Sequence, residues 1–294
     1  MGFLESGSGK STLGRQLYWE DKDTIMISSD SIRLELFGDE NDQTHNSEVF
    51  NEMKRRIRAR LKEDKTVIYD ATNLSAKRRA NFLKQLSDLD IEKECIVVMT
   101  SFDDCVKHQY KRARKVSEEV IRKQIKMFQC PDYGEGWDKI SFNHTSHVPL
   151  IWFKEQNKIP HDNPYHTADV YRHMLNAEEE YIQRYGVDEI GSYAAFYHDL
   201  GKYFCKEFKN KEGAPTKEAH YYGHQNASAY FYLLDNHQFN RIGLENSIKI
   251  ANLIQWHMEF WLRDEKGLEK LRIQLGDEMF ILLKRIHICD EAAH

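Results

Sequence analysis

A run of glycine, serine and lysine near the N-terminus has the composition of a phosphate-binding loop. Residues 7–12 read Gly-Ser-Gly-Lys-Ser-Thr and are followed by leucines at helical spacing. Glycines let main-chain N–H groups close around phosphate oxygens, and the start of a helix adds a favourable dipole. We expect Lys10 to reach the β- and γ-phosphates of ATP and the Ser11 hydroxyl to bind Mg²⁺. The residues predicted to bind ATP are Gly7, Gly9, Lys10, Ser11 and Thr12.

The loop departs from the usual spacing at its first position. The first glycine of such a loop normally stands five residues before the second, but here that position is Leu4, and the nearest earlier glycine is Gly2. Little sequence remains for the strand that should precede the loop. Either the loop is unusual or the chain starts late relative to its relatives, and a flexible turn before a helix is the plainer alternative.

Further polar residues follow the predicted strands. Asp30 ends the strand that begins at Thr24, Arg33 follows one helical turn later, and residues 70–73 (Asp-Ala-Thr-Asn) end the next strand. Parallel sheets bind ligands at this edge, so Asp30 is placed to take a proton from an attacking hydroxyl, unless it only caps a helix. Arg112 and Arg114 precede a helix with an acidic start. They predict either a lid that stabilises transferring phosphates or a solvated surface.

Together these motifs resemble the polynucleotide-kinase type of P-loop phosphotransferase. The matching segments are GSGKST, the Asp30/Arg33 pair, YDATN at 69–73, RKVSEEVI at 114–121 and EGWDKI at 135–140. The similarity covers about residues 1–140. It implies an ATP-dependent 5′-hydroxyl kinase in which Asp30 is the general base, Arg33 helps hold the acceptor end, and Arg112 or Arg114 stabilises charge. Kinases of small molecules share most of these motifs, so the acceptor stays open.

The second half of the chain is rich in residues that can bind metals. Ten of the fourteen histidines follow Pro149. His198 and Asp199 end an apolar helix, His224 begins a helix, and His257 and Asp290 follow further along. Imidazole and carboxylate groups suit divalent transition metals. Any one of these residues alone is more readily a core or surface residue than a ligand.

As an ordered set they resemble the HD superfamily of metal-dependent phosphohydrolases, whose pattern is H…HD…D. The resemblance assigns the pattern to His166, His198-Asp199 and Asp290, and it matches His224 and His257 to the extra histidines of members with a second metal. HDLGK at 198–202 and GHQNAS at 223–228 are particularly similar. The similarity covers about residues 160–294. It implies one or two divalent ions such as Mn²⁺, Co²⁺, Ni²⁺, Fe²⁺ or Zn²⁺; a degenerate, purely structural HD fold is the alternative.

Lys202 is a further candidate for a catalytic role, and His173 and His220 are secondary candidates. Lys202 could stabilise a substrate phosphate or lie on a helix surface. His173 and His220 are expected to support ligands or to lie at the surface.

Two kinds of scaffold must position these residues. Alternating strands and helices in the first half predict an α/β P-loop domain, a parallel sheet flanked by helices, at residues 1–148. Helical patterns in the second half predict an all-α HD phosphohydrolase domain at residues 149–294. The expected strands are 24–29, 66–69 and 94–100; the expected helices are 47–62, 76–86, 166–185, 192–200, 225–236, 246–261 and 270–293.

Composition narrows the class of protein. The net charge of −5 argues against a polycation that grips nucleic acid indiscriminately. No apolar stretch is long enough to span a membrane, and Glu5 and Lys10 interrupt any signal sequence. The five cysteines are widely spaced, which favours reduced thiols and a cytoplasmic protein.

The pairing of the two modules suggests a function. A 5′-hydroxyl kinase joined to a 2′,3′-cyclic phosphodiesterase and 2′-phosphatase would make both ends of a broken RNA ligatable. Enzymes that carry these modules in the opposite order heal ends in this way, and the chain resembles them with the domain order swapped. The expected partners are RNA or DNA ends and a nucleotide triphosphate. A small-molecule or nucleoside kinase fused to a nucleotide phosphohydrolase, and a nucleotide-sensing regulator with an impaired loop, are the alternatives.

Overall fold

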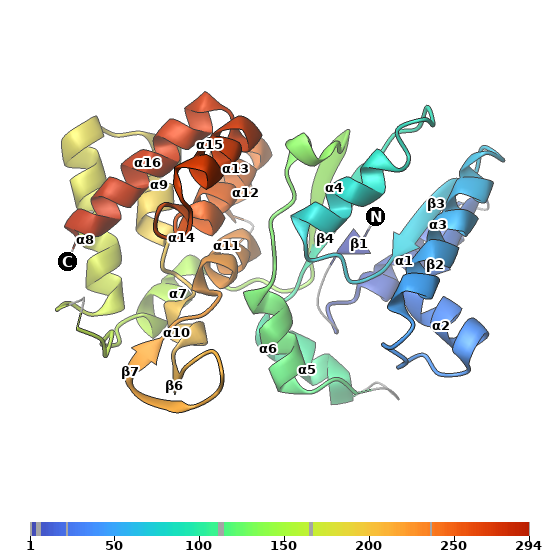
Figure 1. The fold of residues 1–294 in the computed structure, drawn as a ribbon, viewed down its shortest axis with the longest axis horizontal. Helices are drawn as coiled ribbons and strands as arrows, with labels where there is room; N and C mark the ends of the chain where they lie inside the picture. The colour runs from blue at the N-terminus through green and yellow to red at the C-terminus, as the bar shows by residue number, and fades with distance from the viewer. Residues whose placement is uncertain are drawn as a thin grey trace. The chain divides into compact units, whose positions relative to one another are not determined.

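The computed structural model describes residues 2–3, 7–21, 23–110, 115–164, 167–235 and 237–293. The chain divides into two units: unit 1 comprises residues 1–121 and 135–145, and unit 2 comprises residues 122–134 and 146–294. Residues 122–134 thus pack with unit 2, so the chain crosses between the units more often than a single division at residues 148 and 149 requires. Figure 1 colours both units by residue number.

Within the described residues, unit 1 holds a parallel sheet with strand order β2-β3-β1-β4-β5 (Figure 1). The strands are β1 (Gly2–Phe3), β2 (Thr24–Ser28), β3 (Thr66–Asp70), β4 (Glu94–Met99) and β5 (Lys139–His144). The central strand β1 is short, and Gly2 pairs with both Asp70 and Ile96. Strand β1 therefore runs parallel to β3 and β4, whose carboxyl ends form the edge at which parallel sheets bind ligands.

The helices of unit 1 are α1 (Lys10–Glu20), α2 (Ser29–Phe37), α3 (Asn46–Leu61), α4 (Ala76–Lys84) and α5 (Phe102–Tyr110); α6 (Glu118–Lys126) begins in unit 1 and ends in unit 2. Apolar residues spaced by four along α3, Val49, Met53 and Ile57, are buried in one core with Ile27 of β2. This spacing gives the helix an apolar face for the sheet. The expected α/β architecture is confirmed. The sequence did not reveal β5, whose mixed polar pattern is that of a strand at the sheet edge.

Unit 2 is mainly helical, as expected. Its helices are α7 (Leu150–Gln156), α8 (Val170–Tyr185), α9 (Glu189–Tyr197), α10 (Lys202–Cys205), α11 (His224–Leu234), α12 (His237–Ile242), α13 (Leu244–Trp256), α14 (Glu259–Leu262), α15 (Glu265–Leu275) and α16 (Asp277–Ala292). Helix α11 is buried on all sides from Ala227 to Leu234, and α13 is nearly as buried. Two apolar central helices give the other helices a core to pack against.

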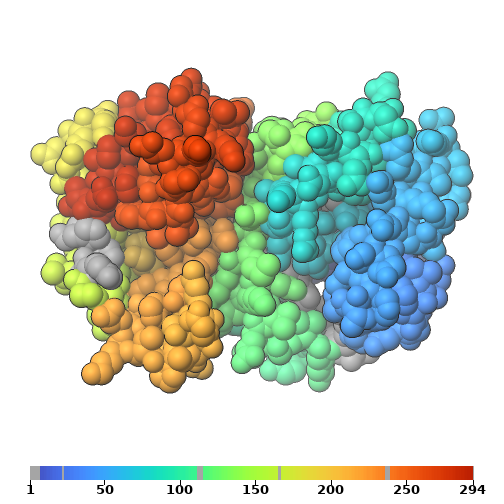
Figure 2. Space-filling model, in the orientation of Figure 1, coloured from blue at the N-terminus to red at the C-terminus, as the bar shows by residue number. Residues whose placement is uncertain are grey.

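Unit 2 differs from the expected pattern in several features. The expected helix 246–261 is divided into α13 and α14, and the short helices α7, α10 and α12 were not expected. The segment 270–293 is split, because Gly276 adopts a left-handed φ of 80° between α15 and α16. An antiparallel hairpin, β6 (Glu207–Lys209) and β7 (Pro215–His220), connects α10 to α11. The hairpin lies at the surface of unit 2 (Figures 1 and 2).

Among the described residues, no helix has the length and apolar character required to span a membrane. All five cysteines are buried free thiols.

Candidate functional site

The first site is the loop that enters α1. Gly7 and Gly9 have φ values of 96° and 92°, a left-handed conformation that side-chain-bearing residues rarely adopt. A Cβ atom at Gly7 would lie 2.3 Å from Gln109 Nε2 and 2.6 Å from the carbonyl oxygen of Cys105. The carbonyl of Gly9 accepts hydrogen bonds from the N–H groups of Thr12 and Leu13, 2.9 and 3.0 Å away. The sequence Gly-Ser-Gly is therefore required by backbone geometry.

Side chains at the end of β4 and on α5 fix the loop from behind. The Thr100 hydroxyl donates to the carbonyl of Ser8 at 2.8 Å, and His108 Nδ1 lies 2.7 Å from the carbonyl of Gly7. These carbonyls therefore point into the protein. With these carbonyls held, the loop N–H groups at the start of α1 remain suited to binding an anion.

A hydroxyl and a carboxylate meet beside the loop. Ser11 Oγ donates to Asp70 Oδ2 at 2.8 Å, and Asp70 at the end of β3 is only 6% exposed. The other carboxylate oxygen, Oδ1, accepts no hydrogen bond from any described residue. A loop serine and a strand-end aspartate are the groups that hold Mg²⁺ in P-loop sites. Ser11 was predicted from sequence; Asp70 was placed at this edge without a role.

Asp30 and Arg33 form a pair on α2. Arg33 donates one N–H to Asp30 Oδ1 at 2.9 Å and another to Asn46 Oδ1 at 2.8 Å. The side chain of Arg33 is 6% exposed, whereas that of Asp30 is 41% exposed. The buried arginine therefore fixes the carboxylate, while Asp30 keeps an open side. Asp30 lies in the first turn of α2. Arg112 and Arg114 lie outside the described residues.

The YDATN and EGWDKI segments meet through a buried ion pair. Arg79 of α4 donates two N–H groups to Glu135, one of them at 2.7 Å to Oε2, and both side chains are buried. Arg79 also donates to the carbonyls of Asn73 and Leu74 at 3.1 Å. The pair therefore holds the loop that follows Asp70.

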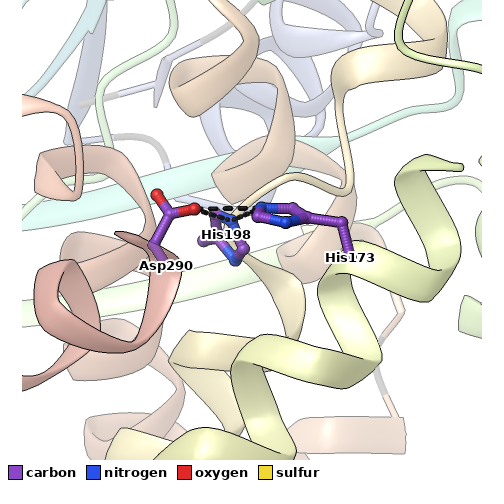
Figure 3. A group of neighbouring side chains, drawn as sticks. All are labelled: His173, His198 and Asp290. Atoms are coloured by element: carbon purple, nitrogen blue, oxygen red, sulfur yellow. Dashed lines mark hydrogen bonds and ion pairs between the residues drawn. The ribbon is translucent and has the colours of Figure 1, made fainter. Parts of the chain in front are cut away.

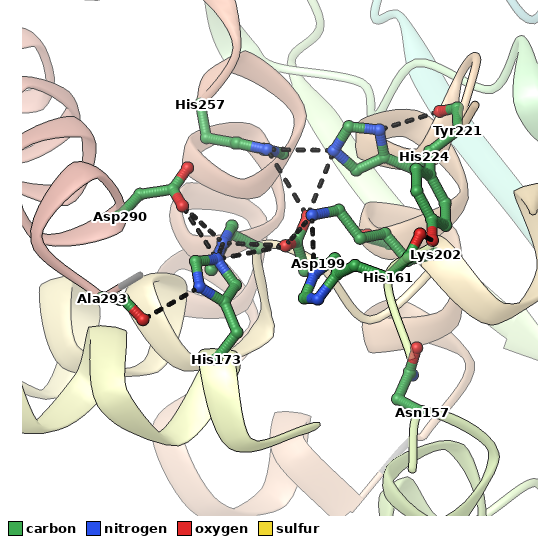
Figure 4. A network of polar contacts seen from close by, with 12 residues as sticks. Asn157, His161, His173, Asp199, Lys202, Tyr221, His224, His257, Asp290 and Ala293 are labelled. Atoms are coloured by element: carbon green, nitrogen blue, oxygen red, sulfur yellow. Dashed lines mark hydrogen bonds and ion pairs between the residues drawn. The ribbon is translucent and has the colours of Figure 1, made fainter. Parts of the chain in front are cut away.

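The second site lies inside unit 2. Five separate segments bring six side chains to one buried centre (Figures 3 and 4). His173 comes from α8, His198 and Asp199 from the end of α9, His224 from the start of α11, His257 from the end of α13, and Asp290 from α16. Each is at most 7% exposed.

One group of ligand atoms surrounds a common point. His173 Nε2 lies 2.9 Å from Asp290 Oδ1 and 3.3 Å from His198 Nε2, and His198 Nε2 lies 3.3 Å from Asp290 Oδ1 (Figure 3). Asp199 Oδ2 lies 3.4 Å from His173 Nε2 and 3.2 Å from His198 Nε2. Ligand atoms bound about 2.0–2.2 Å from one ion are about 3.0–3.5 Å apart. The spacing fits a single cation.

The second group uses the other oxygen of Asp199. Asp199 Oδ1 lies 3.2 Å from His224 Nε2 and 3.9 Å from His257 Nε2, and the two histidine nitrogens are 3.2 Å apart (Figure 4). Asp199 thus presents one carboxylate oxygen to each group. A bridging carboxylate of this kind is suited to two neighbouring cations.

Main-chain carbonyls orient all of these imidazoles. In each ring Nδ1 faces a carbonyl oxygen: Ala293 at 3.4 Å for His173, Ala195 at 2.6 Å for His198, Tyr221 at 2.9 Å for His224 and Ile254 at 2.7 Å for His257. With Nδ1–H as the donor, each Nε2 presents its lone pair to the centre. Lone pairs and carboxylates at these distances repel one another unless positive charge lies among them.

The electrostatics of the centre agree with that requirement. Burial alone would lower the pKa of His198, but the carboxylates of Asp199 and Asp290 outweigh it and raise the pKa to about 10. Burial, reinforced by His198 and His224, lowers the pKa of His257 to about 3. The field near His198 therefore favours a positive charge, while His257 remains a neutral imidazole with a free lone pair.

The structure brings His198, Asp199, His224, His257 and Asp290 together as a set. Lys202 is buried rather than on a helix surface, and its Nζ lies 2.6 Å from Asp199 Oδ2. His166 lies outside the described residues.

The secondary candidates His173 and His220 lie in different parts of unit 2. His173 joins the centre, whereas His220 stacks on Tyr222 at the end of the hairpin, with 5.2 Å between the ring centroids. The sequence held one signal for His173: it lies in the buried stripe of α8 with Val170, Met174 and Ala177. A histidine in an apolar stripe needs a polar partner inside the protein.

Comparison with known proteins bears on the N-terminal part. The model of a family described as "AAA domain" matches residues 5–131. A search of curated proteins gave no match. The family match covers the phosphate loop, Asp30, Arg33 and Asp70, and ends before the histidine–aspartate centre begins. The N-terminal part of the chain is therefore a P-loop domain of the kinase-like, phosphotransferase type.

Proposed function

We propose that the chain is a bifunctional enzyme that prepares broken nucleic-acid ends, most of all RNA ends, for joining. Unit 1 acts as an ATP-dependent 5′-hydroxyl polynucleotide kinase. Unit 2 acts as a metal-dependent 2′,3′-cyclic phosphodiesterase and 2′-phosphatase of the HD superfamily. The P-loop match and the motif resemblance support the first activity, and the buried histidine–aspartate centre supports the second.

In unit 1 the loop N–H groups and Lys10 bind the phosphates of ATP. Ser11 and Asp70, already hydrogen-bonded at 2.8 Å, hold Mg²⁺. Asp30 accepts the proton of the 5′-hydroxyl as its oxygen attacks the γ-phosphorus, while the bond from that phosphorus to the β,γ-bridging oxygen breaks and ADP leaves. Arg33 orients the Asp30 carboxylate through their 2.9 Å contact. The motif resemblance gives Arg112 or Arg114 the role of stabilising charge on the transferring phosphate.

In unit 2 the donor set fits one or two divalent transition metals. His173, His198, Asp199 and Asp290 would hold one ion, and Asp199, His224 and His257 would hold the other. A divalent cation in such a site lowers the pKa of bound water and polarises a phosphoryl oxygen. Around it, Lys202 donates to a phosphate oxygen, and the carbonyl contacts of the imidazoles keep the Nε2 lone pairs inward. The convergence of four Nε2 atoms on two buried carboxylates is the observation that carries this proposal.

The proposal is tested with one substrate and two variants. An RNA with a 5′-hydroxyl and a 2′,3′-cyclic phosphate is incubated with γ-labelled ATP, Mg²⁺ and Mn²⁺, and both ends are mapped. The wild-type protein should add the label to the 5′ end and open the cyclic phosphate. Lys10→Ala should abolish only the first reaction, and Asp199→Asn only the second.

Other outcomes favour other functions. Transfer of label to nucleosides but not to the RNA would indicate a small-molecule kinase and contradict the end-healing proposal. Binding of ATP without any transfer or phosphate release would indicate a nucleotide-sensing regulator and contradict both proposed activities.

A further inference from the structure

Lys202 lies in a socket beside the histidine–aspartate centre. Its Nζ is 2.6 Å from Asp199 Oδ2, 3.3 Å from His161 Nε2 and 5.4 Å from the centroid of the Tyr221 ring (Figure 4). The residue is 7% exposed. A lysine ammonium on a flexible four-carbon stem would otherwise sample many positions. These contacts restrict the ammonium of Lys202 to one position.

Of the residues in this socket, His161 has no role in the proposed reaction. It is 1% exposed, and its Nδ1 lies 2.9 Å from the carbonyl oxygen of Ala168. With Nδ1–H donating to that carbonyl, Nε2 is an acceptor and receives a hydrogen bond from the Lys202 ammonium.

The main chain around His161 is held by hydrogen bonds from the hairpin and from Tyr221. The Tyr221 hydroxyl donates to the main-chain carbonyl of His161, and the N–H of Ala219 in the hairpin donates to the carbonyl of Asp162 at 2.8 Å. His161 is also one of the residues that line a polar cavity of about 500 Å³, together with Asp162, Asn163 and Asp169. The two hydrogen bonds fix the main chain at His161 and Asp162.

We infer that His161 is a positioning residue for the phosphohydrolase reaction, holding the ammonium of Lys202 where it meets a phosphoryl oxygen bound beside Asp199. The inference rests on the proposed function of unit 2. When Asp199 turns its carboxylate to other ligands, the 3.3 Å contact with His161 and the Tyr221 ring still hold Lys202 in place. His161 acts through Lys202 and does not contact the reacting phosphate.

Two amide substitutions separate the roles of the two ring nitrogens. In His161→Gln the side-chain amide reaches the position of Nε2 and keeps an acceptor for Lys202. In His161→Asn the shorter amide reaches the position of Nδ1, keeps the contact with Ala168 and loses Lys202. His161→Ala loses both contacts. His220→Asn, on the surface hairpin, is the matched control.

The full-length variants are compared by three measurements. Metal analysis of Mn²⁺-loaded protein gives the ion content, calorimetric titration with orthophosphate gives the affinity of the loaded site, and cyclic-phosphate hydrolysis gives kcat and KM. We expect equal Mn²⁺ content in all variants. His161→Gln should retain phosphate affinity and kcat, whereas His161→Asn and His161→Ala should lose about tenfold or more in both.

The outcomes distinguish this inference from the proposed function. Equal losses in His161→Gln and His161→Asn, or no loss in either, would overturn the role of His161. If the wild-type protein binds Mn²⁺ and orthophosphate but hydrolyses no cyclic phosphate, the proposed function fails, and the difference in phosphate affinity between the two amide variants still decides the inference. A wild-type protein that binds Mn²⁺ but no orthophosphate overturns both.

Discussion

The two candidate sites consist of different chemical groups, main chain in unit 1 and side chains in unit 2. In unit 1 the site consists largely of main chain, since Gly7 and Gly9 shape a loop whose carbonyls are fixed by Thr100 and His108. In unit 2 the site consists of side chains on α8, α11 and α16 and at the ends of α9 and α13, all facing one buried centre. A main-chain site is contained in one short stretch of sequence. A side-chain site exists only after distant helices have packed.

Because of this difference, substitutions should affect the two sites differently. Substitution in unit 1 removes one contact from a loop that the sheet edge still supports. Substitution in unit 2 leaves the remaining lone pairs and carboxylates buried without their partner, which costs stability as well as activity.

The largest effect is expected for Lys10→Ala. The variant loses the ammonium that stabilises charge on the transferring phosphate, so label transfer to a 5′-hydroxyl RNA should fall about 100- to 1,000-fold. Hydrolysis of a cyclic phosphate should be unchanged, because the histidine–aspartate centre belongs to unit 2. A parallel loss of hydrolysis would show that the two sites are not independent.

His173→Ala is expected to affect only the second site. His173 Nε2 lies within 3.4 Å of three other candidate ligand atoms, so its loss should lower hydrolysis by about 100-fold, the upper end of losses seen for residues that merely support ligands. His220→Ala, which lies on the hairpin, should retain activity. If the two histidine variants behave alike, the assignment of His173 to the centre is wrong.

Metal removal should destabilise the chain through unit 2. At a free Mn²⁺ concentration ten times the dissociation constant, binding adds about 1.4 kcal/mol to the free energy of unfolding. Chelation should therefore lower the Tm of the wild-type protein and of Lys10→Ala equally. His198→Ala should show a lower Tm that Mn²⁺ no longer raises, and a full Mn²⁺ response in that variant would contradict the site.

A matched pair of glycines gives the smallest effects. Gly223 and Gly38 are both left-handed, with φ and ψ of 79° and 12° at Gly223 and of 75° and −1° at Gly38. A Cβ atom at Gly223 would lie 2.8 Å from the carbonyl oxygen of Lys126, while none of the described atoms approaches within 4 Å at Gly38. Gly38→Ala should cost about 1 kcal/mol for its backbone conformation alone.

Gly223→Ala should cost more than Gly38→Ala, and it should weaken Mn²⁺ binding because His224 follows directly. Chemical denaturation and Mn²⁺ titration of the two variants measure both effects. Equal costs and equal Mn²⁺ affinities would show that the close approach at Gly223 does not position His224.

The two sites were also unequally predictable from sequence. The phosphate loop could be read from Gly7 to Thr12 because its geometry depends on neighbouring residues. The contact between Ser11 and Asp70 joins residues 59 positions apart, and only the order of strands in the sheet places them together. The alternation of strands and helices predicted the α/β fold. Strand β5 and the hairpin were missed because polar and apolar side chains are mixed along them.

For the second site, residue types and chain order were sufficient to name most members but not all. His198, Asp199, His224, His257 and Asp290 were expected and lie together. His173 was ranked below His166, because spacing alone does not say which face of α8 turns inward. That information came from packing, since His173 is fully buried in the stripe that faces α9 and α16.

The cation site in unit 2 is the central claim, and crystals of the protein soaked in Mn²⁺ would test it most directly. An anomalous difference map should contain peaks within about 2.5 Å of His173 Nε2, His198 Nε2 and the Asp199 carboxylate. A map whose only peaks lie at surface carboxylates, with none among the buried imidazoles, would contradict the account.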